Sequence, residues 1–120
     1  IFDDADLEKA VEGALIAKFR NGGQTCICAN RFYVHKKILS PFLEKFIHKV
    51  RSMKVGDPRE KETDFTHTLH SDSQAKVRAH IEDALKKGAK AHLGAKKPHE
   101  PEILTGATHD MLIFNEETFG

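Results

Sequence analysis

Segments with helical periodicity alternate along this chain with short segments rich in β-branched and aromatic residues, and that alternation limits the folds open to it. Apolar residues recur at helical spacing in three stretches, which we predict to be helices. The first runs from Asp6 to the Asn21-Gly22-Gly23 turn, the second starts at Ser40-Pro41, and the third covers residues 73–87. Candidate strands lie at residues 31–35, 89–93, 103–104 and 111–114. This order predicts an α/β fold with a largely parallel, open sheet and flanking helices.

The ends and faces of these helices follow from local chemistry. Asp6 is a suitable N-cap, and Pro41 suits the first helical position because its missing N–H is not needed there. Gly88 after two lysines is typical of a helix C-terminus. The faces predicted to be buried carry Leu7, Val11, Ala14, Leu15 and Lys18 in the first helix, Phe42, Phe46, Ile47, Val50 and Met53 in the second, and Val77, Ile81, Ala84 and Leu85 in the third.

Composition excludes several classes of protein. The 120 residues predict one domain, and 19 basic against 18 acidic residues leave a net charge of +1, which gives no support for nucleic-acid binding. No apolar run approaches the roughly 20 residues that cross a bilayer, and the acidic start is unlike a signal peptide. Two cysteines fit a reducing compartment, so we expect a cytoplasmic protein. Ile1-Phe2 resembles the tail of a strand and Gly120 follows an apolar stretch, so we expect a piece of a larger protein.

Cys26 lies on a glycine-containing loop, directly after Asn21-Gly22-Gly23-Gln24-Thr25. Glycines let the backbone approach a ligand closely, and such a loop can direct backbone N–H groups at an oxyanion. A thiol there can be a nucleophile if its thiolate is favoured. The alternative is that Cys26 is a small buried apolar residue, which is the commoner role of a lone cysteine.

Residues 19–31, with the sequence FRNGGQTCICANR, resemble the active-site cysteine segment of the NAD(P)-dependent aldehyde dehydrogenases. Two further blocks of that family match in the same order, DDADL at residues 3–7 and EETFG at residues 116–120. Within the family, Phe19-Arg20-Asn21 and the Cys-x-Cys pair are most similar to succinate-semialdehyde dehydrogenases. The resemblance implies that residues 1–120 are a truncated catalytic domain, whose dinucleotide-binding and oligomerisation segments lie outside the chain.

The resemblance also implies roles for individual residues. Cys26 would attack the aldehyde, and its own backbone N–H would form half of the oxyanion hole. Arg20 would contact the distal carboxylate of succinate semialdehyde, whereas its alternative role is that of an ordinary basic residue at a helix C-terminus. Glu117 would bind the nicotinamide ribose of NAD or NADP and Phe119 would lie against the nicotinamide, the alternative being a solvated glutamate beside a core aromatic.

Cys26 and Cys28 lie one residue apart, so oxidation could join them in a strained, labile disulfide. This predicts a redox switch in which Cys28 captures the nucleophile, and the alternative is that Cys28 points into the core. We expect no metal, because His67 and His70 have no third ligand nearby in the sequence.

The same resemblance sets expectations for the chain alone. The oxyanion asparagine and the general-base glutamate of the family lie upstream of Ile1, so the fragment should be inactive and should self-associate, while the parent should be a homo-oligomer. Two stretches depart from the family pattern, residues 66–70 and 95–102, with Glu102 in place of a usual threonine. The alternatives are a broader aldehyde dehydrogenase, or a thiol-bearing folding or interaction unit without catalysis.

Overall fold

The computed structural model describes residues 1–66, 70–94 and 100–120. Its elements are α1 (Leu7–Phe19), the 3-10 turn η1 (Arg20–Gly23), α2 (Leu39–Ser52), α3 (Ser71–Lys86), β1 (Lys90–Ala91), β2 (Leu104–Thr105) and α4 (Leu112–Asn115). The three long helices form where the sequence predicts them, and Asp6 caps α1 by accepting a hydrogen bond from the Lys9 N–H at 3.2 Å. Among the described residues, no helix is long and apolar enough to cross a bilayer.

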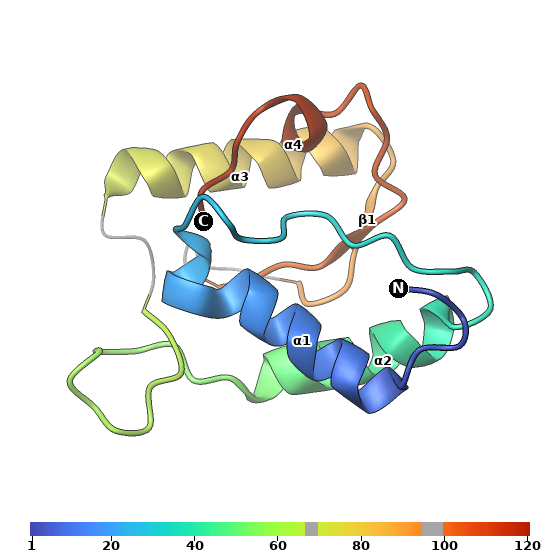
Figure 1. Cartoon of the computed structure of the whole chain (residues 1–120). Helices are drawn as coiled ribbons and strands as arrows, with labels where there is room; N and C mark the ends of the chain where they lie inside the picture. Colours follow the sequence, from blue (N-terminus) through green and yellow to red (C-terminus); the bar gives the residue numbers. More distant parts are fainter. Residues whose placement is uncertain (67–69, 95–99) are drawn as a thin grey trace.

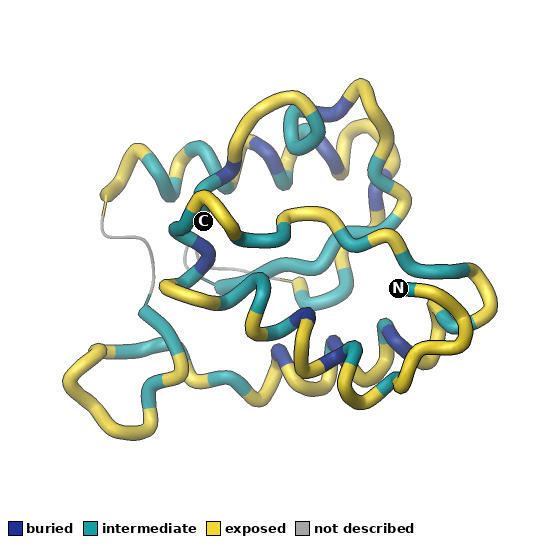
Figure 2. Tube along the Cα trace, viewed as in Figure 1, coloured by how far each residue is buried: buried dark blue, intermediate teal, exposed yellow. Residues whose placement is uncertain are grey.

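α1 and α2 pack against each other around the larger of two cores (Figure 1). Its buried members are Val11 and Ala14 of α1 and Phe42, Phe46 and Val50 of α2, and Figure 2 shows buried segments along both helices. The Phe42 and Phe46 rings stack with their centroids 5.6 Å apart, and Phe32 lies 5.7 Å from Phe46. Phe42, Phe46 and Val50 are thus buried as predicted for α2, whereas Ile47 and Met53 are only half-buried and Met53 lies just past the end of the helix.

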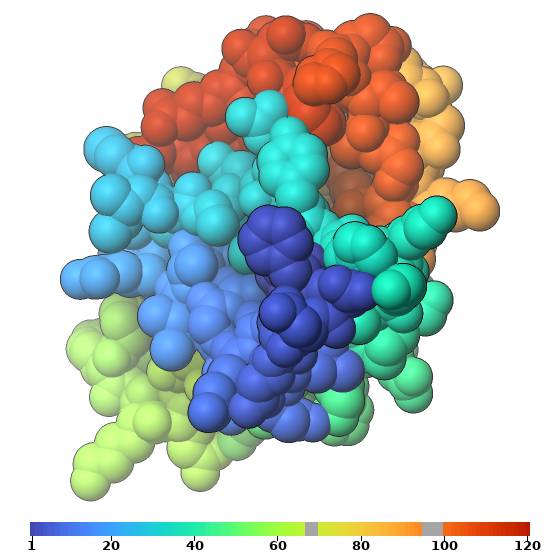
Figure 3. Space-filling view, turned by 45° about the vertical axis from the view of Figure 1, so that its right-hand side comes forward, coloured from blue at the N-terminus to red at the C-terminus, as the bar shows by residue number. Residues whose placement is uncertain are grey.

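The extended chain between η1 and α2 runs beside the N-terminus (Figure 3). The Ile1 ammonium donates to the Tyr33 carbonyl at 2.6 Å, and the His35 N–H donates to the Ile1 carbonyl at 2.9 Å. Residues 31–35 are thus extended, as predicted, but they form no sheet ladder with any described residue. Their Phe32 and Val34 side chains contact the α1–α2 core.

The sheet differs from the largely parallel one expected from the sequence. β1 and β2 pair antiparallel, with Lys90 opposite Thr105 and Ala91 opposite Leu104. Parallel strands need a long crossover connection, usually a helix, and the described residues between β1 and β2 contain no helix. The one parallel pairing among the described residues is an isolated bridge between Val55 and Phe65.

Residues 111–114 were expected to form a strand, and that prediction is wrong because residues 112–115 form the short helix α4. A run of four apolar residues fits either structure by periodicity alone. Hydrogen bonds of polar side chains, one distant in the sequence and one local, stabilise the helix. Asp83 accepts a hydrogen bond from the Leu112 N–H at 2.7 Å, and the Asn115 side chain donates to the Met111 carbonyl at 2.9 Å.

α3 packs with α4 around the second core, which contains Ala84, Ala89 and Met111. The predicted buried face of α3 is partly wrong. Ala84 is buried, but Leu85 is 42% exposed and the second buried residue of this helix is His80. A polar side chain four residues before Ala84 takes the inner position because it has a buried hydrogen-bond partner there, the Thr118 hydroxyl.

Candidate active site

The cysteine loop begins where the chain reverses at the end of α1. Asn21, Gly22 and Gly23 all have left-handed backbones, with φ of 51°, 62° and 81°. A Cβ on Gly22 would lie 2.6 Å from the Thr66 carbonyl oxygen, and one on Gly23 would lie 2.9 Å from the Gly120 backbone. Both positions therefore require glycine for conformation and for close approach to the backbone of the chain itself, whereas the approach to a ligand expected from the sequence stays a prediction.

Short-range hydrogen bonds hold the loop around Cys26. The Asn21 side chain donates to the Gln24 carbonyl at 3.1 Å, and the Gln24 N–H donates to the Asn21 carbonyl at 3.1 Å. The Cys28 N–H donates to the Thr25 carbonyl at 3.1 Å. Cys26 is left at the tip, exposed and with a free thiol, and within the described part of the chain no group accepts its backbone N–H. An unpaired N–H beside an accessible sulfur is available to donate one hydrogen bond to an anion that forms there.

Cys28 has a different environment from Cys26. Its thiol is free and half-buried, and it lies 3.6 Å from the Arg20 carbonyl oxygen, to which it can donate a weak hydrogen bond. The structure therefore contains the two cysteines in their reduced form, one exposed and one turned back toward the end of α1. The Cys28 thiol is directed toward the Arg20 carbonyl, and both alternatives for Cys28, capture of Cys26 and a position facing the core, stay predictions.

Arg20 occupies the C-cap position of α1, and its side chain is exposed. Within the described residues its guanidinium forms no ion pair, so its hydrogen-bond donors remain available to an anion from outside the chain. Its place at a helix C-terminus also fits the alternative of a favourable interaction with the helix dipole.

Lys18 joins the cysteine loop to the C-terminal segment, a role that the sequence did not reveal. Its ammonium donates to the Asn30 side-chain oxygen at 3.0 Å and to the Gly120 carbonyl at 2.7 Å. Burial lowers the pKa of this ammonium, and the nearby Cys28 opposes that shift. Gly120 is thereby held beside the start of the loop that carries Cys26. Helical spacing placed Lys18 on the inner face of α1, but no local pattern indicates a contact 102 residues away.

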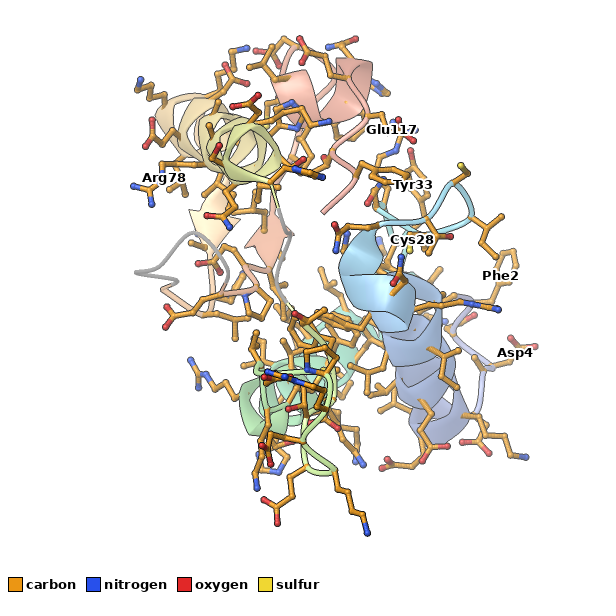
Figure 4. The ribbon with its side chains drawn as sticks, turned by 90° about the vertical axis from the view of Figure 1, so that its left-hand side faces the viewer. Phe2, Asp4, Cys28, Tyr33, Arg78 and Glu117 are labelled. Carbon is orange, nitrogen blue, oxygen red and sulfur yellow. The ribbon has the colours of Figure 1, made fainter. Side chains whose placement is uncertain are left out.

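Glu117 and Phe119 lie on this C-terminal segment. Glu117 is exposed, and Phe119 is half-buried with a left-handed backbone at φ 55°. Figure 4 shows Glu117, Tyr33 and Cys28 along the same side of the molecule. The EETFG block and the cysteine loop are separated by most of the sequence. The structure brings the end of that block to the loop through the contact of Lys18 with Gly120.

The departures from the family pattern fall partly outside the described residues. Residues 67–69, including His67 of the pair considered for a metal, and residues 95–99 lie outside them. In the part of the chain that is described, no group of three metal-ligating side chains occurs. Glu102, which replaces a usual threonine, has a structural role. Its carboxylate accepts hydrogen bonds from the backbone N–H groups of His92, Leu93, Gly94 and Ile103 at 2.8–3.0 Å.

Comparisons with known proteins agree with the motifs over the whole chain. The model of the aldehyde dehydrogenase family matches residues 1–120. The chain is 46% identical over 124 residues to a glutarate-semialdehyde dehydrogenase of Pseudomonas putida and 44% identical over 127 residues to the NADP(+) succinate-semialdehyde dehydrogenase of Escherichia coli. Each alignment covers 100% of this chain and 26% of the relative.

A solved structure gives the same result. The crystal structure of an aldehyde dehydrogenase from Brucella melitensis biovar abortus superimposes with a TM-score of 0.93 and 50% sequence identity, over 99% of this chain and 26% of that one. The chain therefore spans about a quarter of the length of the proteins it matches.

Proposed function

Because this chain belongs to the aldehyde dehydrogenase family, we propose that its parent protein oxidises an aldehyde with a distal carboxylate, succinate semialdehyde first, to the acid with NAD or NADP. The observation that carries the proposal is the exposed Cys26, whose backbone N–H has no acceptor among the described residues, six residues after an arginine that forms no ion pair with any of them. The names of the relatives support this substrate class, since succinate and glutarate semialdehydes both carry a carboxylate at the far end.

The chemistry assigned to Cys26 has two stages. Its thiolate attacks the aldehyde carbon to form a thiohemiacetal, whose oxyanion accepts the Cys26 N–H. Loss of a hydride then leaves a thioester, and water hydrolyses it to release the acid and the free thiol. NAD(P), when bound, would accept this hydride. The net change is aldehyde, water and oxidised cofactor to acid, reduced cofactor and a proton.

Glu117 and Phe119 are the residues of this chain proposed to hold the cofactor. An exposed carboxylate can accept hydrogen bonds from two ribose hydroxyls, and an aromatic face can pack against a flat ring. Their segment is tied to the cysteine loop by Lys18, which fits a cofactor that must lie beside the sulfur. The name of the Escherichia coli relative carries NADP(+), and the choice between NAD and NADP for this protein stays open.

Residues 1–120 are proposed to be part of a catalytic domain rather than a complete enzyme. The chain carries the nucleophile and a substrate arginine, whereas the base and the other oxyanion donor are assigned to segments outside it. Positioning and preorganised electrostatics supply much of the acceleration of an enzyme. The chain alone should therefore reduce no NAD(P) with succinate semialdehyde, and it should self-associate through surfaces that a homo-oligomeric parent covers.

Kinetics on the parent protein test the substrate assignment. Arg20→Ala should lower kcat/KM for succinate semialdehyde by roughly 10- to 150-fold, because a hydrogen bond to a charged group contributes about 1.5–3 kcal/mol. Butanal, a neutral aldehyde of the same length, should be nearly unaffected. Arg78→Ala is the matched control, since Arg78 is exposed on α3 and lies away from Cys28 (Figure 4). Equal losses on both aldehydes would make Arg20 structural and favour a broader aldehyde dehydrogenase.

We also propose that Cys26 and Cys28 form a reversible redox switch. Peroxide oxidises the Cys26 thiolate to a sulfenic acid, and the Cys28 thiol then displaces water to form the disulfide. The contact of Cys28 with the Arg20 carbonyl is weak, so its thiol can turn toward Cys26 at little cost.

Activity of the parent after peroxide and then dithiothreitol tests the switch. In the parent itself, activity should fall with peroxide and return with dithiothreitol. In Cys28→Ala the reversible loss should disappear. Reversible loss of the same size in that variant would show that Cys28 does not resolve the oxidised Cys26.

A further inference from the structure

His80 is a buried titratable residue that the proposed chemistry does not use. It lies on the inner face of α3 and is 1% exposed. Both of its ring nitrogens have partners on the segment that carries Glu117. Nδ1 lies 3.1 Å from the Thr118 hydroxyl, and Nε2 lies 3.3 Å from a carboxylate oxygen of Glu116.

The direction of these hydrogen bonds follows from the chemistry of the partners. A carboxylate only accepts, so Nε2 of His80 carries a hydrogen and donates it to Glu116. In the neutral ring Nδ1 is then the acceptor, and the Thr118 hydroxyl donates to it. Asp83, one turn further along α3, is the other charged group near the ring. Every polar atom of the imidazole is thereby used.

Hydroxyl, imidazole and carboxylate occur here in the order found in hydrolytic triads, but the arrangement cannot act on a substrate. Thr118 is only 8% exposed, so its oxygen is not accessible to a reacting carbonyl. A nucleophile must be reachable, and this hydroxyl is not. The three groups instead tie residues 116–118 to α3.

The two hydrogen bonds of His80 hold the residues that flank Glu117 in the sequence, Glu116 and Thr118. The backbone at Glu116 is extended, with φ −123° and ψ 147°, and successive side chains of an extended chain point in opposite directions. Glu116 and Thr118 both contact His80, so Glu117 between them points away from α3. It is exposed, while its neighbour Thr118 is buried. Lys18 fixes the same segment from the other end through Gly120.

We propose that His80 is a positioning residue that holds Glu116 and Thr118 against α3 and so presents Glu117 and Phe119 to the cofactor. This inference rests on the proposed role of Glu117 and Phe119 in cofactor binding. When the tie is lost, the segment adopts the binding conformation only part of the time, and the apparent affinity for cofactor falls by that fraction.

The test measures the dissociation constant of NADH and NADPH by fluorescence on the parent protein, for four variants and one double variant. Thr118→Val removes the hydroxyl with little change of shape and should weaken binding about 5- to 10-fold, because it leaves a buried nitrogen without a partner. Thr118→Ser restores the hydroxyl and should bind within about twofold of the parent. His80→Gln can keep one of the two partners, as Thr118→Val does, and should give a loss of similar size.

The remaining variants separate this inference from the proposed function. Glu117→Gln should weaken binding by itself, and adding Thr118→Val to it should cause a smaller further loss than Thr118→Val causes alone, since part of the effect of Thr118→Val acts through Glu117. If Glu117→Gln binds the cofactor normally, the proposed cofactor role fails. If Glu117→Gln weakens binding but Thr118→Val and His80→Gln do not, or if the losses simply multiply in the double variant, the cofactor role stands and the positioning role of His80 is overturned.

Discussion

The α1–α2 region and the region from α3 to the C-terminus bury similar helices by different means. Around α1 and α2 the buried residues are all apolar, and phenylalanine rings contact one another across the core. Around α3 the apolar core is smaller, and polar side chains hold the loops. Asp83 accepts the Leu112 N–H, the Lys87 ammonium donates to the Asp110 carbonyl, and Glu102 accepts four backbone N–H groups. Packing thus dominates one region and specific hydrogen bonds the other.

The comparison predicts the largest stability loss for a core truncation in the first region. Phe46→Ala removes a ring that contacts both Phe32 and Phe42, and it should lower the free energy of unfolding by about 3–5 kcal/mol. Urea unfolding of the chain measures the loss. Phe2→Ala is the matched control, because Phe2 is 78% exposed and its removal should change little. A loss at Phe46 no larger than at Phe2 would show that packing does not hold this region.

A polar substitution should have the next largest effect, and it falls in the second region. Glu102→Gln keeps one accepting oxygen but turns an amide NH₂ toward backbone donors that are 2.8–3.0 Å from the carboxylate. Losing a hydrogen bond to a charged group costs about 1.5–3 kcal/mol, so we expect a loss of that size. Glu12→Gln, at an exposed position of α1, is the control in the same urea experiment. If Glu102→Gln and Glu12→Gln have the same free energy of unfolding, the hydrogen bonds of Glu102 do not stabilise this region.

The same contrast explains what could be predicted from the sequence. The helices of the first region follow from apolar spacing, because a buried stripe repeats every three or four residues and is visible locally. The aldehyde dehydrogenase fold and family were also predictable, since the three blocks occur in order and the comparisons confirm the family. Cys26 and the two glycines before it were identified in the same way, and the structure explains both glycines by their backbone geometry.

In the second region the sequence predicts α3 itself, but not α4 or the buried face of α3, because the groups that determine these are distant in the sequence and have no period. The helix α4 depends on Asp83, 29 residues earlier, and the buried face of α3 depends on partners of His80 at Glu116 and Thr118. Lys18 contacts Gly120 across almost the whole chain. None of these side chains differs in its local sequence from an ordinary exposed residue. Polar contacts that join remote segments leave no signal in a single sequence.

The smallest effect should come from Asp83, whose contribution depends on pH. The hydrogen bond from Lys87 and that from the Leu112 N–H hold the pKa of the Asp83 carboxyl below its ordinary value of 3.8. A carboxyl with a lowered folded pKa stabilises the protein above its unfolded pKa, and this stabilisation is lost as the pH falls through the folded pKa. Asp83→Asn should therefore be less stable than the parent sequence at pH 7, and the difference should shrink below pH 3.8.

Urea unfolding at several pH values between 7 and 2 checks this last expectation. Subtracting the two free energies isolates Asp83, because the other carboxyls titrate in both proteins and cancel. Asp4→Asn, on the exposed N-terminal turn, should show no such convergence with the parent sequence. A difference at Asp83 that stays constant down to pH 2 would mean that its shape rather than its charge orders α4. In that case the second region would depend on packing as the first one does, and the contrast between them would be one of degree.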